Sequence, residues 1–430
     1  MSEGQGPPPP DEQRPGEGMD SGERPADSAA EPPPQQEPDL TGSRAVAAWF
    51  STRAGGILVP LAATVLAFLV GGIVILFTGH SPLGAYQGIA EGTGLNYPWL
   101  WVTGQETRAA WGDLQQTLII TSPLILTALA VAFAFRCGMF NIGGQGQYWV
   151  GLIASLYVGL HLEGVPRPLH VLLAAAAAVA AGFLWGGIAG FLKATVGAHE
   201  VISTIMLNWI AIYVGKYLFE LGGPLQGDEP SIPRSNDVVE SAQLWPIGTG
   251  LQPLHAGIFI SLAALVVYHV ILNRTTLGYE VRAVGFNPEG ARYGGISVSR
   301  NYFLALAISG AFAGLAGAVD ILGWKYRVAT NDFDVGAIGF IGIAVALLGR
   351  NKAIGILFAA LLFGALQVGT STRQLDPSIF PPELAGNLAT MIQALIILFV
   401  GAELLIVYAW GLRRRVGFSG PSRVQPELGG

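Results

Sequence analysis

Uncharged amide side chains gather in one glycine-rich stretch, residues 136–151 (RCGMFNIGGQGQYWVG). Glycine at this density weakens a helix. Non-helical backbone at membrane depth is tolerated only where it lines a cavity or is buried in protein. Amides bind polar partners without the cost of a buried charge, so they suit the path of a polar, uncharged solute. Hydrogen bonds between packed helices are the alternative. The amides are Asn141, Gln145 and Gln147.

A second polar group begins the segment AHEVISTIMLNWI, which starts at Ala198. Its polar residues stand at the spacing of one helical stripe, which we expect to face the interior of a helix bundle. The single carboxylate could couple transport to an ion, or it could simply be solvated near the inner interface. The stripe consists of Glu200, Ser203, Thr204 and Asn208.

The most polar internal loop is 274–299 (RTTLGYEVRAVGFNPEGARYGGISVS). Asn287 fits the N-cap of a short helix, Pro288 its first position and Glu289 its dipole. Gly294 and Gly295 would end that helix. A short helix across the inner face of a membrane protein suits the transfer of motion from a soluble motor. An ordinary basic inner loop is the alternative.

Motifs for catalysis are absent from the sequence. It contains no G-x-x-x-x-G-K-[ST] phosphate loop, no zinc-ligand spacing, no G-x-S-x-G and no paired catalytic carboxylates. We therefore expect no catalytic site, no metal and no cofactor in this chain. The single cysteine, Cys137, excludes an intramolecular disulfide.

The elements that position these residues are predicted to be membrane spans. Charged residues are 12% of the chain and apolar residues 51%, whereas soluble proteins carry about 25% charged residues. Apolar runs long enough to cross a hydrocarbon core of about 30 Å predict an all-α polytopic membrane protein with about ten spans. The predicted spans are 57–77, 116–135, 140–160, 169–192, 200–221, 256–273, 300–322, 335–349, 353–371 and 388–410.

Charge sets the expected topology. With the N-terminus inside, alternation of the spans puts most of the 23 Lys and Arg residues on the cytoplasmic side. Residues 1–43 hold ten Asp and Glu but only Arg14 and Arg24, and they are rich in proline. We expect them to form a disordered cytoplasmic tail. The predicted transmembrane domain is 44–415, and 416–430 is a short cytoplasmic tail.

Two long segments are predicted to be external, 78–115 and 222–255. They contain several tryptophans and prolines. They form either an interfacial aromatic belt or a docking surface for an external protein. No basic patch indicates a nucleic acid polymer as a partner.

A weak internal echo favours a transporter. Residues 140–143 (FNIG) and 333–336 (FDVG) each open a short glycine-containing span, and the second of these spans is the fifth after the first. The two would insert with opposite orientation. This predicts two inverted-repeat halves with some broken helices, a recurrent construction in transporters.

Five segments together resemble the branched-chain amino acid/simple-sugar permease family of bacterial ABC importers. Within it, the chain looks most like the nucleoside-type permeases partnered with BMP-family lipoproteins. The resemblance covers about 50–412. The segments are FNIGGQGQ at 140–147, HEVISTIMLNWIA at 199–211, TTLGYEVRAVGFNPEGARYGGISV at 275–298, SGAFAGLAGA at 309–318 and GFIGIAVALLGRNKAIG at 339–355.

The resemblance implies a permease subunit in the bacterial plasma membrane, with both termini cytoplasmic. It would work with a cytoplasmic ABC ATPase that hydrolyses ATP, a second permease subunit and an external substrate-binding lipoprotein. The solute would be a nucleoside or a similar neutral polar molecule. A ribose-type sugar permease and an ion-coupled secondary transporter remain alternatives. The polar amides and the stripe would line the path. The coupling loop would be Gly278, Arg282, Gly285, Asn287, Pro288, Ala291, Arg292, Tyr293 and Gly294.

Overall fold

The structure, a computed structural model, describes residues 43–250, 252–335, 337–371 and 382–401. The chain divides into two compact units, 1–51 and 52–430. Of the first unit only the beginning of one helix is described, so the account below concerns the second. The predicted tails lie outside the described residues, apart from Ser43. The described part of the last predicted span ends at Gly401.

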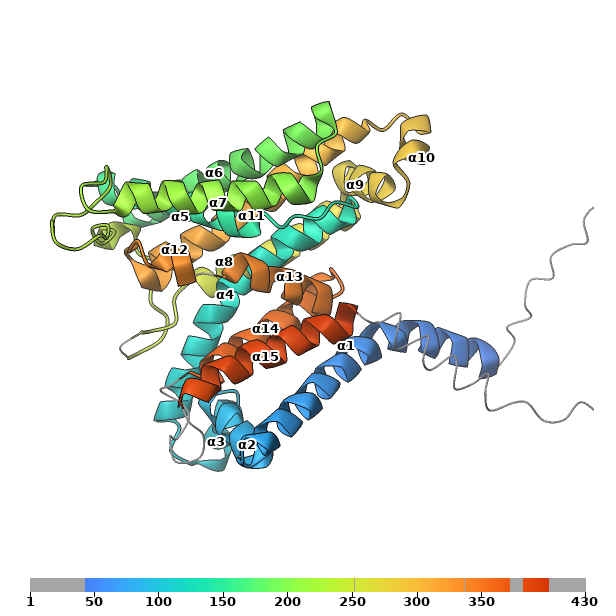
Figure 1. The fold of residues 1–430 in the computed structure, drawn as a ribbon, viewed down its shortest axis with the longest axis vertical. Coiled ribbons are helices and arrows are strands. Elements are labelled where there is room, and N and C mark those ends of the chain that lie inside the picture. The colour runs from blue at the N-terminus through green and yellow to red at the C-terminus, as the bar shows by residue number, and fades with distance from the viewer. Residues whose placement is uncertain (1–42, 251, 336, 372–381, 402–430) are drawn as a thin grey trace, which may run out of the picture. The chain divides into compact units, whose positions relative to one another are not determined.

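Every predicted span contains a helix in the part of the chain that is described (Figure 1). Six of these helices are both long and apolar enough to cross a membrane by themselves. The prediction of an all-α polytopic membrane protein is confirmed. The helices are α1 Ser43–Phe77, α4 Arg108–Arg136, α5 Gly144–His161, α6 Arg167–Val196, α7 Glu200–Phe219, α8 Gly257–Arg274, α11 Val298–Asp320, α13 Ile338–Leu348, α14 Ala353–Gly369 and α15 Pro382–Gly401.

Shorter helices lie in the connections. β-structure among the described residues is limited to two isolated bridges, Arg234 with Ala329 and Pro246 with His255. One π-helical turn, η2, directly continues α11, a feature that often marks functional positions. The short elements are α2 Pro82–Gly92, α3 Tyr97–Thr103, the 3₁₀ turn η1 Glu240–Ala242, α9 Thr276–Phe286, α10 Pro288–Tyr293, η2 Ile321–Lys325 and α12 Asp332–Val335.

Burial separates central helices from peripheral ones. The apolar window of α4 is 83% buried, whereas that of α7 is only 22% buried. Helix α7 leaves apolar side chains such as Trp209 and Tyr213 more than half exposed. Exposed apolar surface of this kind is what a lipid bilayer covers. The structure therefore has a protein-filled centre around α4 and a surface suited to lipid.

Small residues allow α6 and α11 to approach closely. Side by side with α5 and α7 in Figure 1, these two helices share the most extensive contact in the described structure. A Cβ on Gly182 would meet the Gly310 carbonyl oxygen, and a Cβ on Gly310 would meet that of Gly182. Packing of backbone on backbone is the usual way that membrane helices associate without a hydrophobic driving force.

Candidate functional site

The helices α5 and α13 begin close together inside the bundle. Gly144 opens α5 and Gly339 lies at the start of α13, and a Cβ on either would contact the other segment. The Gly339 N–H donates to the side-chain Oε1 of Gln145 at 2.8 Å. The two segments singled out as an internal echo thus open helices whose N-terminal ends meet. The inverted relation of the two halves stays a prediction.

The amides of Asn141 and Gln147 bond to each other at this junction. The Asn141 Nδ2 donates to Gln147 Oε1 at 2.8 Å and to the Ser309 hydroxyl of α11 at 2.6 Å. Its Oδ1 accepts from the Gly143 N–H at 2.8 Å. Both amide side chains are buried. These groups make their hydrogen bonds within the protein, so they hold α5 against α11.

Helix α7 joins the same cluster through Asn208. Its Oδ1 accepts from the Gly146 N–H at 2.7 Å, and its Nδ2 donates to the Ile142 carbonyl at 2.8 Å. Thr204, one turn earlier, is also buried and lies beside the position where a Cβ on Gly143 would stand. The stripe therefore does face the bundle interior at these two residues, as its spacing predicts.

Gln145 is the amide of this cluster that keeps an unpaired hydrogen-bond donor. Its Oε1 is occupied by Gly339, but its Nε2 is buried without a hydrogen-bond partner. An unpaired buried donor costs roughly 1–3 kcal/mol. Of the three amides singled out in the sequence, Gln145 is the one that keeps an unpaired hydrogen-bond donor.

Glu200 and Ser203 do not reach this cluster. Glu200, at the start of α7, forms an ion pair of 2.8 Å with Lys193 in the last turn of α6. The Ser203 hydroxyl donates to the His199 carbonyl of its own turn at 3.1 Å. The structure thus places the stripe in two parts, a buried amide end and a paired, half-buried charged end.

Replacing Asn141 by leucine should destabilise the bundle. Leucine has a similar branched shape but strips hydrogen-bond partners from Gln147, Gly143 and Ser309. We expect the free energy of unfolding to fall by about 2–4 kcal/mol, since each buried group left unpaired costs roughly 1–3 kcal/mol. Denaturant unfolding in detergent micelles measures the change. Asn273→Leu is the control, because Asn273 is exposed and bonds only to its own helix. Equal free energies of unfolding for both variants would contradict the role of Asn141 in holding α5 against α11.

The loop 274–299 forms two helices, α9 and α10, which lie next to the end of α8 (Figure 1). The predicted start of α10 is confirmed: Asn287 is its N-cap and accepts from the Gly290 N–H at 3.0 Å, and Pro288 is its first residue. Gly294 caps its end, and Gly295 follows with a φ of 80°. Helix α9, capped by Thr275, was not predicted.

Glycines seat α9 on the bundle. A Cβ on Gly278 would meet the Ile271 carbonyl of α8, and a Cβ on Gly285 would meet the Arg136 carbonyl at the end of α4. The α9–α10 pair therefore rests directly on the ends of two long helices. A force applied to α9 passes to α4 and α8 through backbone contact, which rigid packing transmits.

The tip of the α9–α10 pair carries exposed aromatic side chains. Phe286 is 94% exposed and Tyr293 is 92% exposed, with Arg292 exposed between Ala291 and Tyr293. Ala291 is buried and anchors α10. Aromatic residues and arginine are enriched where proteins bind one another. Phe286 was missed in the sequence, where it looks like one more apolar residue at a helix end.

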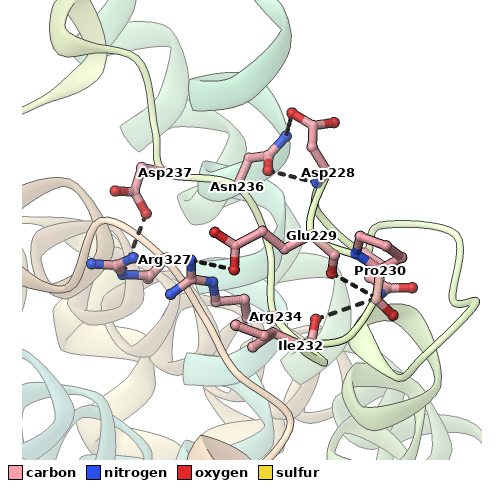
Figure 2. Close-up of polar contacts among 9 residues, drawn as sticks. Asp228, Glu229, Pro230, Ile232, Arg234, Asn236, Asp237 and Arg327 are labelled. Carbon is pink, nitrogen blue, oxygen red and sulfur yellow. Dashed lines mark hydrogen bonds and ion pairs between the residues drawn. The ribbon is translucent and has the colours of Figure 1, made fainter.

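Charged pairs order the segment predicted to be external between α7 and α8. Arg234 pairs with Glu229 at 2.9 Å, and Arg327, from the turn after η2, pairs with Asp237 at 3.3 Å (Figure 2). Asn236 bonds both the backbone and the carboxylate of Asp228. These half-exposed pairs contribute little stability, yet they present a folded polar surface rather than a loose loop.

A buried charge lies at the end of α11. Asp320 is 2% exposed; its Oδ2 accepts from the Tyr148 hydroxyl at 2.6 Å, and its Oδ1 accepts from the Trp324 indole at 2.9 Å. Lys325 stands 3.7 Å from the same carboxylate. The signal that could have found this pair, an aspartate within a predicted span and a lysine shortly after it, was missed in the sequence.

The chain matches known transport proteins over most of its length. A sequence model of the family described as branched-chain amino acid transport system / permease component matches residues 114–401. The chain is 38% identical over 366 residues to the guanosine ABC transporter permease protein NupP of Bacillus subtilis, covering 85% of this chain and 99% of that protein. It is 35% identical to the nucleoside ABC transporter permease protein NupB of Lactococcus lactis, covering 81% and 92%. The glucose ABC transporter permease protein TsgB13 of Haloferax volcanii is 33% identical, covering 89% and 94%.

Proposed function

This chain belongs to the branched-chain amino acid transport system permease family, and we propose that it forms the path by which an ATP-driven importer moves a nucleoside into the cell. The observation that carries the nucleoside is the similarity, over nearly the whole of each relative, to permeases named for guanosine and for nucleosides. The glucose permease, at lower identity, keeps a simple sugar as the alternative.

The buried amide cluster supports a neutral solute. Within the described residues, the junction of α5, α7 and α13 is built from amides and hydroxyls, and the ion pair at the start of α7, Lys193 with Glu200, is internally neutral. A charged solute would enter this region at a high desolvation cost with no counter-ion. In the proposal the junction flanks the path, and Gln145 Nε2 contacts the solute.

The aromatic tip supports a cytoplasmic ABC ATPase as partner. Phe286, Tyr293 and Arg292 form a projecting surface that rests on the ends of α4 and α8. In the proposed cycle, ATP closes the ATPase pair and the α9–α10 pair transmits that motion to the bundle. A second permease subunit completes the path, and an external lipoprotein docks on the folded segment shown in Figure 2. Both termini are cytoplasmic in this arrangement.

Uptake of radiolabelled guanosine into proteoliposomes tests the proposal. The chain is reconstituted with its ATPase, second permease and binding protein, and ATP is supplied on the ATPase side. ATP-dependent accumulation of guanosine is expected, without an ion gradient. Uptake of a simple sugar with none of guanosine would replace the nucleoside by the alternative solute.

Replacing Glu200 by glutamine separates this proposal from ion-coupled transport. Glutamine keeps the length and the hydrogen-bonding capacity of this side chain beside Lys193 and removes only its charge, so ATP-dependent uptake should stay within about twofold of wild type. The assay is the guanosine uptake described above, with and without sodium and proton gradients. Abolished uptake, with the protein level unchanged, would assign Glu200 to the transport cycle.

A further inference from the structure

A partly open cleft with polar lining residues lies away from the amide cluster. It has a volume of about 670 Å³ and lies between the first turns of α4, η2, the end of α14 and the loop residues Thr249, Gly250 and Gln252. Small-molecule sites commonly have volumes of roughly 300–1,000 Å³. No ionisable side chain is among the described residues that line it. We call it the glutamine vestibule, after Gln115, Gln116, Gln252 and Gln367, which line it with Trp324.

The glutamine side chains differ in how many hydrogen bonds they already make within the protein. Gln115 is committed to the protein: its Nε2 donates to the Thr249 carbonyl at 3.1 Å and its Oε1 accepts from the Leu254 N–H at 3.1 Å. Gln367 differs, because its Nε2 is buried with no hydrogen-bond partner. Gln116 makes only one long contact, 3.4 Å to the Gln252 carbonyl. Gln116 and Gln367 therefore keep donors and acceptors for a ligand.

Trp324 gives the vestibule an aromatic wall of fixed position. Its indole N–H is held by Asp320 at 2.9 Å, and Asp320 is held in turn by the Tyr148 hydroxyl of α5 at 2.6 Å. Lys325 neutralises that carboxylate at 3.7 Å. Burial lowers the pKa of the neighbouring His255 to about 4, so this ring is neutral at physiological pH. The charged groups behind Trp324, Asp320 and Lys325, thus carry no net charge together.

We propose that the glutamine vestibule binds a neutral nucleoside, with the base against Trp324 and its polar edge on Gln116 and Gln367. Bases taken out of a stack are held by aromatic faces and by hydrogen bonds to their edges, and glutamine is a frequent partner of purine edges. The described residues of the lining include no basic side chain, which disfavours a phosphorylated nucleotide. The inference rests on the proposed function and places its substrate at a second, predicted external, position.

Cysteine protection tests the vestibule in the complete importer. The native Cys137 is buried, so Ser371→Cys places one reactive thiol on the vestibule lining. Membrane vesicles carrying this variant with its partner subunits are treated with a maleimide, with and without guanosine, and guanosine uptake is measured in the same vesicles. Repeating the labelling without the external binding protein assigns any protection to the permease. Ser231→Cys, on the exposed loop, is the control for reagent access.

Guanosine near saturation should slow labelling at 371 about fivefold or more by mass action, and leave labelling at 231 unchanged. Adding Gln367→Leu should remove the protection. Gln393→Leu should not, although Gln393 also has a buried Nε2 without a partner. Equal labelling rates with and without guanosine, in vesicles that take up guanosine, would overturn the vestibule and leave the proposed function standing. Protection by ribose or by guanosine monophosphate as strong as that by guanosine would overturn the nucleoside as occupant. Vesicles without guanosine uptake would overturn the proposed function itself.

Discussion

Phe286→Asp should detach the permease from its ATPase. Truncation of a central aromatic residue at a protein interface often costs 2 kcal/mol or more, so association should weaken at least about 30-fold and ATP-driven uptake should fall below about a tenth of wild type. Phe286 is 94% exposed, so the substitution leaves the packing of α9 intact. Co-purification of the ATPase and guanosine uptake are the two measurements.

Two further variants test whether that loss arises from the contact between the α9–α10 pair and the ATPase. Phe286→Leu keeps an apolar contact and should retain most of the association. Gly294→Trp adds bulk at the end of α10, where a Cβ meets nothing closer than the Ala291 carbonyl at 3.4 Å. It should therefore block docking without unfolding the helix. If Phe286→Asp and Gly294→Trp both keep ATPase association and uptake, the α9–α10 pair is not the coupling surface.

Gly310→Ala should destabilise the bundle. The added methyl would meet the Gly182 carbonyl oxygen and lie 2.9 Å from the Gly182 carbonyl carbon and 3.2 Å from the Gly186 Cα. Since these neighbours are backbone atoms of another helix, α6 and α11 must separate. Overpacking usually costs about 1–3 kcal/mol; we expect at least the upper end here. The measurements are the yield of folded protein and denaturant unfolding in detergent.

Gly386→Ala is the matched control, because it makes the same substitution in α15, where a Cβ meets nothing within 4 Å. It should be neutral or stabilising by up to about 1 kcal/mol through helix propensity. A loss of stability common to both variants would show that helical glycine in general, rather than the contact between α6 and α11, sets the cost.

Local features were predictable from the sequence because their causes are local. Apolar runs located the helices, and the order Asn287-Pro288-Glu289 located α10, since an N-cap side chain bonds backbone only two or three residues ahead. Motif similarity located the family, which the comparison over residues 114–401 confirms. The coupling role, the solute path and the cytoplasmic termini stay predictions, because they depend on partners and a membrane rather than on the fold of one chain.

The role of the amides in residues 136–151 could not be predicted from the sequence. Their residue types left two readings open, a solute path or a lock between helices. Only the fold brings Asn141 to Ser309, 168 positions away, and leaves Gln145 with an unpaired donor. Hydrogen-bond capacity is a property of each residue, but its use depends on which helix packs alongside, and no periodicity encodes that.

Some features of this protein therefore follow from the sequence alone, and others follow only from the tertiary structure. Composition, spacing and caps by themselves determined a helical membrane protein with a short helix that begins at Pro288, and the motif resemblance located the family. Tertiary structure alone decided that Phe286 projects, that two short helices meet at Gly144 and Gly339, and that distant glutamines share one vestibule with Trp324. The reason is physical: helix formation is set by neighbours along the chain, whereas a site is set by packing between segments that are remote in sequence.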